Sequence, residues 1–420
     1  MTGKYLFVLL AAFGLFGSPC LRRLEAQQQT GIDWLKLVDH EAGRPNYLAG
    51  LEPALPDAIA LPPPPLGEPP AIVRALYGNA WVFGSSRFYD LVRLADTTEI
   101  NALVLDVKDD TGYLTYRSSV PTAVAIGANT RIRARDVRER LALLNEKGIH
   151  AIARIVVAKD PLLARMKPEW AIHDTRGGLW HDRQGNAWVD AFQDSVWTYA
   201  ADLAAEAVLM GFSEVQFDYV RFPDEPQSLL ARAVYPARPV GETQRQAVRR
   251  QLTLLRGRIK PLGVPFTIDI FGLATSATTD MGIGQYWEDL VVQADVVLPM
   301  VYPSHYQRGA YGFARPNFEP YAVVKRALEY GIRRSATIPG AAKIRPFLQS
   351  FTLGRPRYTA HEVRAQIQAA EDLGIQDWVL WNARGVYPPG ALRSTAEYSA
   401  RAGTAADAAG AGEVAGSTGP

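Results

Sequence analysis

VWTYAADLAAEAVLMGFSEVQFDYV, residues 196–220, contains the pattern that decides the fold. Its first part, residues 196–211, is rich in alanine and ends in Gly211, the residue type favoured just past the C-terminus of a helix. EVQFDYV, residues 214–220, then has the length and the valine and aromatic content of a buried strand. A helix that leads this closely into a strand is typical of a βαβ unit, in which the strands pair in parallel.

The same alternation runs through most of the chain. Strands are expected at 77–83, 101–107, 149–157, 214–220, 264–272, 294–302, 335–340 and 376–382. Helical patterns lie between them at 135–148, 196–211 and 322–331, each ending in glycine, and at 360–373. This order predicts an α/β protein with a single (β/α)8 TIM barrel, whose active site lies at the carboxyl ends of the strands. A doubly wound sheet is the alternative, but no G-x-G-x-x-G motif follows the first strand, which disfavours it.

Both ends of the chain lie outside this pattern. Residues 1–26 contain an apolar run at 5–16 and predict a secretory signal peptide, with a retained signal anchor as the alternative. Residues 27–75 end in a proline-rich stretch, LPPPPLGEPP, and predict an extended linker. Residues 397–420 have few large apolar side chains and predict a disordered tail. The folded domain is therefore expected at 76–396.

The composition is that of a globular protein, and export is expected from the predicted signal peptide. Hydrophobic residues make up 48% of the 420 residues and charged residues 21%, as in proteins with a sizeable core. The 45 basic and 43 acidic residues nearly balance and no basic run stands out, so no nucleic-acid partner is expected. We expect a periplasmic, cell-envelope or extracellular location, with the membrane reached only through a signal anchor or a lipid on Cys20, the single cysteine.

Charged residues occupy the ends of four predicted strands. Alternate residues of a strand point to opposite faces, so Asp218 shares a face with Glu214 and Gln216, opposite the apolar residues of its strand. The same alternation places Asp106 with Lys108 on one face, and Asp269 opposite isoleucine and phenylalanine; Arg154 is the lone charge of the third strand. Because an unpaired buried charge is costly, we expect these side chains to converge in the barrel and to enclose a polar pocket.

Structural ion pairing is the alternative interpretation of these charges. It would join Asp106 to Arg154 or Lys108, and Asp218 to Arg221, without any catalytic role.

Aromatic residues gather after the third, sixth and eighth predicted strands. They are Trp170, Trp180 and Trp188; Tyr302, Tyr306 and Tyr311, with His305 among them; and Trp381, which is followed by Asn382. Flat rings stack on sugar faces, and the loops after barrel strands are where substrates bind. Ordinary packing is the alternative for each single ring.

Several other chemistries lack their motifs. The sequence has no phosphate-binding glycine loop, no HExxH motif and no G-x-S-x-G elbow. Among the six histidines only His173 and His181 have a ligand-like spacing, and they are expected in a loop. We therefore expect no metal and no cofactor, and the carboxylates that remain suit acid/base or nucleophilic attack on a glycosidic bond.

The motifs also resemble those of a known family. LVLDVKDDTG, IARIVVAKDP, EVQFDYVRFP, VLPMVYPSHY, IRPFLQSFT and VLWNARGVY occur in this order and together resemble the DUF4015 family of glycoside-hydrolase-like barrels, from about Trp81 to Tyr387. The D-Y-x-R-[FY]-P element is similar to that of exported barrels that act on peptidoglycan glycan strands. The resemblance implies a TIM-barrel glycosidase without naming a substrate. No glutamate stands two residues beyond Asp218, as it does in chitinase-type barrels, so a substrate-assisted mechanism is not expected.

Taken with the resemblance, the residues predict an exported glycoside hydrolase that cleaves an oligo- or polysaccharide such as a cell-wall glycan. Asp218 is expected to be nucleophile or base and Asp269 the general acid, with Asp106 as the reserve candidate for either role.

Seven further residues are expected to bind substrate. Arg154, Lys108 and Arg221 would hold the carboxylates ionised or bind sugar hydroxyls, and Tyr302, His305, Trp381 and Asn382 would shape the sugar subsite. A non-catalytic carbohydrate-binding barrel of the cell envelope is the alternative. An aldolase is disfavoured because aspartates beside Lys108 would keep it protonated, and a metal-dependent hydrolase because no histidine pairs lie on strands.

Overall fold

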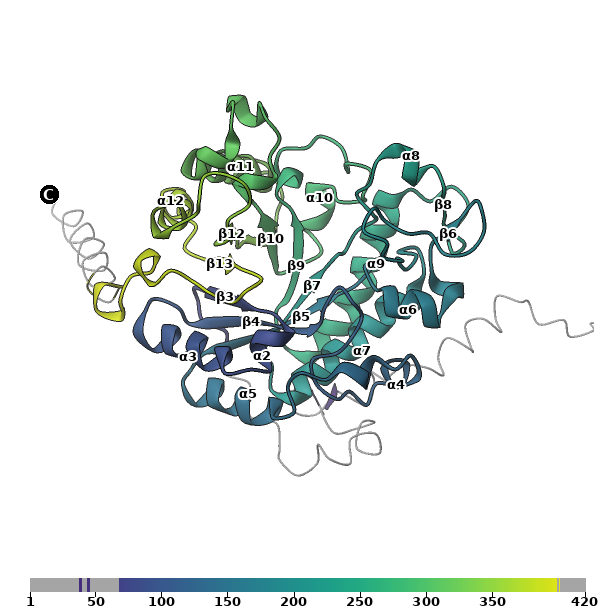
Figure 1. Cartoon of the computed structure of the whole chain (residues 1–420), viewed down its shortest axis with the longest axis horizontal. Helices are drawn as coiled ribbons and strands as arrows, with labels where there is room; N and C mark the ends of the chain where they lie inside the picture. The colour runs from purple at the N-terminus through teal and green to yellow at the C-terminus, as the bar shows by residue number, and fades with distance from the viewer. Residues whose placement is uncertain (1–37, 40–43, 46–67, 399, 401–420) are drawn as a thin grey trace, which may run out of the picture.

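Eight parallel strands close into a barrel in the computed structural model, which describes residues 38–39, 44–45, 68–398 and 400 (Figure 1). The barrel strands are β3 (Arg74–Gly78), β4 (Ala102–Lys108), β5 (His150–Val156), β7 (Glu214–Asp218), β9 (Phe266–Phe271), β10 (Val296–Met300), β12 (Phe347–Gln349) and β13 (Trp378–Trp381). Each pairs in parallel with the next, and β13 pairs with β3. The predicted TIM barrel is therefore confirmed.

Helices surround this ring of strands (Figure 1). They are α2 (Ala80–Phe83), α3 (Arg87–Thr97), α4 (Pro121–Ala125), α5 (Val137–Glu146), α6 (Pro161–Met166), α7 (Asp194–Met210), α8 (Gln227–Leu230), α9 (Gln244–Ile259), α10 (Trp287–Leu290), α11 (Pro320–Ser335) and α12 (Ala360–Glu371). Short strands complete the elements: β1 (Val38–Asp39), β2 (Arg44–Pro45), β6 (His173–Asp174), β8 (Ala233–Val234) and β11 (Lys343–Ile344). None of the helices in the described part of the chain is long and apolar enough to cross a membrane.

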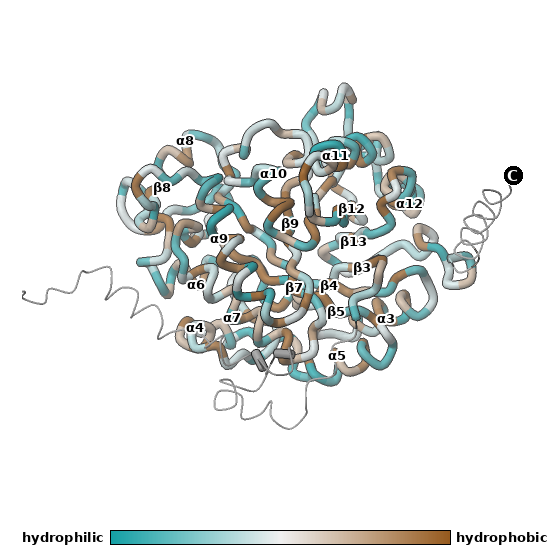
Figure 2. The backbone as a smooth tube through the Cα atoms, turned by 180° about the vertical axis from the view of Figure 1, so that it is seen from behind, coloured by the Kyte–Doolittle hydropathy of each residue, from teal (hydrophilic) through white to brown (hydrophobic). Residues whose placement is uncertain are grey.

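The helix–strand unit that decided the fold forms as its sequence predicts. α7 ends at Met210, and Gly211 takes the left-handed conformation, with φ of 116°, that lets the chain turn back into β7. The side chains of Val215 and Phe217 then join the apolar layer between the strands and the helices. In Figure 2 the hydrophobic segments lie mainly in the middle of the molecule and the hydrophilic ones mainly at its periphery.

The first strand lies earlier than predicted. It spans Arg74–Gly78, and the residues expected to continue it form helix α2. Asn79 causes this change, because its side chain accepts a hydrogen bond from the backbone N–H of Val82 and so caps a helix. The strand also begins two residues before the predicted domain start at residue 76.

The seventh strand lies later than predicted. Helix α11 does not stop at Gly331 but continues to Ser335, so 335–340 forms no strand, and the chain pairs instead through β11 and β12. Gly331 serves helix packing, since a Cβ there would lie 3.0 Å from the ring of Trp287. The signal peptide predicted at 1–26 lies outside the described residues, as do most of the linker and of the tail.

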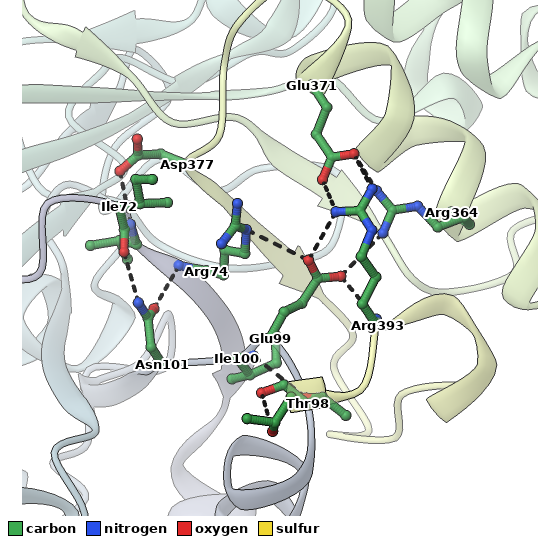
Figure 3. Close-up of polar contacts among 12 residues, drawn as sticks. Ile72, Arg74, Thr98, Glu99, Ile100, Asn101, Arg364, Glu371, Asp377 and Arg393 are labelled. Atoms are coloured by element: carbon green, nitrogen blue, oxygen red, sulfur yellow. Dashed lines mark hydrogen bonds and ion pairs between the residues drawn. The ribbon is translucent and has the colours of Figure 1, made fainter. Parts of the chain in front are cut away.

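The amino ends of the strands are held by buried ion pairs. Glu99, which precedes β4, accepts hydrogen bonds from Arg364 of α12 and from Arg393, and its carboxylate lies 3.7 Å from Nε of Arg74 (Figure 3). Glu371 of α12 binds the same two arginines, Arg364 and Arg393. The network ties the first barrel strand to the last helix and so closes the barrel at the end that lies away from the carboxyl ends of the strands.

Candidate active site

Three aspartates from three strands converge on Arg154 of β5. Nη1 of Arg154 donates to Oδ1 of Asp106 at 2.6 Å, Nη2 donates to Asp218, and Nε lies 3.5 Å from Oδ2 of Asp269. All four side chains are buried, with at most 8% of any residue exposed. They come from the carboxyl-terminal halves of β4, β5, β7 and β9, the end of the barrel where active sites lie in this fold. The expected convergence is therefore present.

Two further side chains hold the aspartates in place. The hydroxyl of Tyr77 donates to Oδ2 of Asp106 at 2.6 Å, and Nε2 of Gln216 donates to Oδ2 of Asp269 at 3.0 Å. Oδ1 of Asp269 is buried without a hydrogen-bond partner among the described residues. A buried carboxyl oxygen left unpaired in this way is available to a proton or a ligand. Tyr77 was not predicted as a site residue, because only a strand that starts at Arg74 brings it to the carboxyl end.

The aspartates have different electrostatic environments. Burial raises the pKa of Asp269 well above its ordinary value, and the negative charge of Asp218 raises it further. Burial also raises the pKa of Asp106, to about 6, against the opposing effect of Arg154. Asp269 therefore holds a proton at pH values where an ordinary aspartate is ionised, which is the condition for a general acid.

An aromatic wall, formed by Tyr77, Tyr302, Phe351 and Trp381, stands beside the aspartates. The ring of Trp381 stacks on that of Tyr77 with centroids 5.7 Å apart, and lies 5.9 Å from Tyr302 and 5.0 Å from Phe351. Burial raises the pKa of Tyr302, and the negative charges of Asp269 and Asp218 raise it further, so the Tyr302 hydroxyl interacts electrostatically with both carboxyl groups. The side chain of Trp381 is only partly buried, and the exposed His305 lies 5.3 Å from Tyr302. The wall therefore extends from the buried carboxylates to side chains that are partly or fully exposed to solvent.

Arg221, which follows β7, is buried and forms no ion pair with an acidic side chain among the described residues. Its guanidinium is 4.7 Å from the ring of Tyr219 and 4.5 Å from that of Phe271, and its one hydrogen bond to a described residue goes to the carbonyl oxygen of Phe222. The ion pair with Asp218 that the structural interpretation required is absent from the described part of the chain, since Asp218 pairs with Arg154 instead. Arg221 therefore keeps N–H groups free for a ligand.

Lys108 faces away from the site. The register between β4 and β5 shifts after Asp106, so that Lys108 pairs with Ile155, an outward-facing residue, and not with the inward face. Its ammonium donates to Asp160 at 2.6 Å and lies 5.0 Å from the ring of Tyr199 in α7. The prediction that Lys108 shares the face of Asp106 is therefore wrong, and the reason is a bulge that strict alternation does not include.

The side chain of Asn382 forms hydrogen bonds with the backbone of the neighbouring loops. Its amide nitrogen donates to the carbonyl oxygens of Ser350 and Val386, at 2.6 and 2.8 Å, and its oxygen accepts from the N–H of Arg384. The residue therefore shapes the loop after β13 and so supports the neighbouring Trp381.

The loops after β5 and β7 pack into one unit beside the site. Strands β6 and β8 pair in antiparallel, and Asp190 accepts a hydrogen bond from the backbone of Ala237 at 2.9 Å across the two loops (Figure 1). Trp180 and Trp188, expected as possible sugar platforms, are only 0% and 3% exposed and anchor this unit. Ordinary packing explains these two rings.

No group of histidine, cysteine, aspartate and glutamate side chains in the described ranges could hold a metal ion. Arg154 occupies the position between the three carboxylates that a cation would need.

Comparison with known proteins gives a family and a fold. The DUF4015 family, described as "Putative glycosyl hydrolase domain", matches residues 75–387. Among solved structures, the glycoside hydrolase domain of PgaB (BpsB) from Bordetella bronchiseptica is 13% identical, covers 74% of this chain and 94% of its own, and has a TM-score of 0.51. A hypothetical protein from Ruminiclostridium thermocellum is 36% identical over 44% of this chain and 92% of its own, with a TM-score of 0.40. No curated protein matches the sequence.

Proposed function

Because the chain belongs to the DUF4015 family of glycosyl hydrolase domains, we propose that it cleaves a polysaccharide or cell-wall glycan with Asp218 and Asp269 as its catalytic pair. One observation carries the proposal: Asp218 accepts a hydrogen bond from Nη2 of Arg154 and Asp269 lies 3.5 Å from Nε, and these two nitrogens form one edge of the guanidinium group. Two carboxyl groups held this close cannot both be ionised without a large repulsion, so they divide into an acid and a base.

The acid is Asp269 in this proposal. Its raised pKa keeps it protonated, and its unpaired Oδ1 is the atom placed to give a proton to the glycosidic oxygen. Asp218 is the nucleophile or base in this proposal, and it pairs with Arg154. Asp106 pairs with another nitrogen of that guanidinium and with Tyr77, so it orients Arg154 and stays in reserve as a catalytic group.

The shared arginine edge also favours a retaining mechanism. Carboxyl groups of retaining glycosidases lie about 5 Å apart, whereas inverting enzymes separate them by about 6.5–9.5 Å to admit a water molecule. Contact with adjacent nitrogens of one guanidinium group brings Asp218 and Asp269 towards the shorter separation. Asp218 then acts as the nucleophile and forms a glycosyl ester, and Asp269 first protonates the leaving oxygen and then deprotonates the water that hydrolyses the ester.

The sugar binds against the aromatic wall in this scheme. Trp381 and Tyr302 offer ring surface beside the carboxylates, and the free N–H groups of Arg221 are placed for sugar hydroxyls on the side of β7 and β9. Export by a signal peptide at residues 1–26 is also part of the proposal, since the apolar run at 5–16 supports it.

The test is release of new reducing ends by the full chain. The substrates are α- and β-glucans, galactosaminoglycans, chitin fragments and peptidoglycan strands stripped of peptide, and the variants are Asp218→Asn and Asp269→Asn. Asp96→Asn, an exposed aspartate of α3, is the matched control. Release by the wild type and by the control but by neither site variant supports the proposal.

Two other outcomes argue against it. Tight binding of one glycan without release by any protein points to a non-catalytic carbohydrate-binding barrel. Release that survives in both site variants moves the chemistry to other residues.

A further inference from the structure

A cavity of about 1130 Å³ lies outside the barrel, between the segment that follows β4 and helices α5 and α7. Five arginines line it, namely Arg117, Arg131, Arg133, Arg135 and Arg138, against a single acidic residue, Glu139. The chain as a whole has nearly balanced charges, with 45 basic and 43 acidic residues, so this concentration of positive charge is local. Such a cavity attracts anions.

The side chains of the cavity arginines form no hydrogen bonds or ion pairs within the described part of the chain. Arg117, Arg135 and Arg138 form no hydrogen bond or ion pair through their side chains with any described residue. The guanidinium groups of Arg131 and Arg133 lie over the rings of Tyr113 and Trp81, 4.3 and 3.6 Å from the ring centroids, and their N–H groups form no hydrogen bond with any described residue. Guanidinium groups in this state have their hydrogen-bonding edges available for an external acceptor.

A neighbouring arginine, Arg140, differs from the cavity arginines because its side chain has hydrogen-bond partners in the protein. Arg140, two residues after Arg138 in α5, donates to Asp136 at 2.8 Å and to the carbonyl oxygen of Ser85 at 2.9 Å. Because Asp136 is turned towards Arg140, its side chain does not cap the first turn of α5. Val137 and Arg138 of that first turn line the cavity, so the uncapped amino end of a ten-residue helix adds to the positive potential.

The nearest buried acid does not neutralise the cluster. Glu206 of α7 is 1% exposed, and its Oε1 accepts hydrogen bonds from the N–H and hydroxyl of Ser119 at 2.7 and 2.8 Å. Burial raises the pKa of Glu206, and burial also lowers the pKa of Arg138, against the opposing effect of the charges of Glu139 and Glu206. Arg138 therefore gains from an anion that enters the cavity.

We propose that this cavity binds a ligand with several phosphate groups, either a free oligophosphate or the headgroup of an anionic phospholipid. Arginine forks match the oxygen geometry of phosphate, and phosphate binds at helix amino ends for the same electrostatic reasons. The cavity volume of about 1130 Å³ is slightly above the usual range for small-ligand sites, about 300–1,000 Å³, so the cavity has room for more than one phosphate. The inference does not depend on the proposed glycosidase activity.

Calorimetry on the full chain tests the free ligand, with tripolyphosphate as the probe and glucuronate as a singly charged comparison. Co-sedimentation with vesicles that contain cardiolipin, whose headgroup carries two phosphates, against phosphatidylcholine vesicles, tests the lipid. The variant is Arg117→Glu with Arg135→Glu. The control is Arg249→Glu on α9, which also replaces an exposed arginine whose side chain forms no hydrogen bond or ion pair with any described residue.

We expect the Kd for one of the two phosphate probes to rise at least tenfold in the double variant and to stay unchanged in the control, with an unchanged Tm in both. Tripolyphosphate binding identifies a free ligand, and vesicle binding alone identifies a lipid headgroup. The proposal is overturned if the wild type binds neither probe, or if the double variant binds as tightly as the control.

Discussion

Asp218 of β7 and Asp269 of β9 lie on neighbouring strands and bind the same edge of the Arg154 guanidinium. The arrangement places two like charges against one positive group, which can fully compensate only one of them. The charge on Asp218 therefore adds to the effect of burial and raises the pKa of Asp269. The division into acid and base follows from the packing of two strands, before any substrate binds.

The first prediction concerns this coupling. Replacing Asp218 with Asn removes a negative neighbour, so the pKa of Asp269 is expected to fall and its titration to move to lower pH. Carbon NMR of labelled aspartate carboxyl groups measures the change. Asp106→Asn serves as the comparison and is expected to give a smaller shift, because the charge of Asp106 has a weaker effect on Asp269. An unchanged titration of Asp269 in Asp218→Asn contradicts the assignment.

Gln216 gives a second prediction that keeps the catalytic residues intact. Its hydrogen bond stabilises the ionised form of Asp269 and so lowers the pKa of that carboxyl. Gln216→Met removes the bond, and the pKa of Asp269 is expected to rise. Because a general acid works only while protonated, the alkaline limb of the kcat profile should move to higher pH. A limb that stays in place or moves to lower pH shows that another group is the acid.

Arg154 gives a third prediction, about stability. Arg154→Met leaves the buried carboxyl groups of Asp106, Asp218 and Asp269 without their positive partner, and the loss of one member of such a buried network costs about 3–5 kcal/mol. The cost should be largest near neutral pH and should shrink in acid, where the aspartates are protonated. Urea unfolding at several pH values measures both effects. The exposed Arg249→Met is the control, and equal stability of the two variants contradicts the role given to Arg154.

Much of the site was predictable because alternation along a strand is a local property. The residues of β7 alone separate Gln216 and Asp218 from Val215 and Phe217, and the structure keeps this separation. The convergence with Asp269 then follows from parallel pairing, which brings the carboxyl ends of neighbouring strands together.

The remaining features depend on contacts between distant segments. The shift in register that turns Lys108 outwards appears only when β4 pairs with β5. The buried hydrogen bond between Lys108 and Asp160 stabilises this outward orientation. Tyr77 was not predicted as a site residue, because Asn79 caps a helix where the apolar residues suggested that the strand continues. Gly331 is a related case. Helix α11 continues beyond this glycine, whose missing side chain leaves room for the ring of Trp287.

Trp381 gives a prediction about substrate binding. Trp381→Ala removes the partly exposed ring of the aromatic wall and is expected to lower kcat/KM about tenfold, since aromatic stacking contributes about 0.5–1.5 kcal/mol beyond the area it buries. Trp381→Phe should retain most of the activity. Trp180→Phe is the control, because its ring is fully buried in the loop unit and should affect stability more than kcat/KM. A larger loss of kcat/KM in Trp180→Phe than in Trp381→Ala would exclude the aromatic wall as a sugar subsite.

Glu214 gives the last prediction, because it lies on the same strand as Asp218 but at the opposite end of the barrel. Its carboxylate accepts a hydrogen bond from Arg345 at 2.6 Å and lies 3.0 Å from Nε2 of His150. Burial alone would raise the pKa of Glu214, but the charge of Arg345 and the contact with His150 lower it to about 2, from an ordinary value of 4.5. The ionised form therefore stabilises the folded state above about pH 4.5, and this contribution is lost as the pH falls towards 2.

Glu214→Gln should consequently reduce the free energy of unfolding by about 3 kcal/mol near neutral pH, and the difference from the wild type should narrow below about pH 4.5. Urea unfolding at neutral and acid pH measures it, with the exposed Glu169→Gln as the control. Activity per folded molecule should not change, since Glu214 begins β7 and Asp218 ends it. A variant that is as stable as the wild type but inactive would reverse the roles given to the two ends of this strand and would place the chemistry at the amino ends of the barrel.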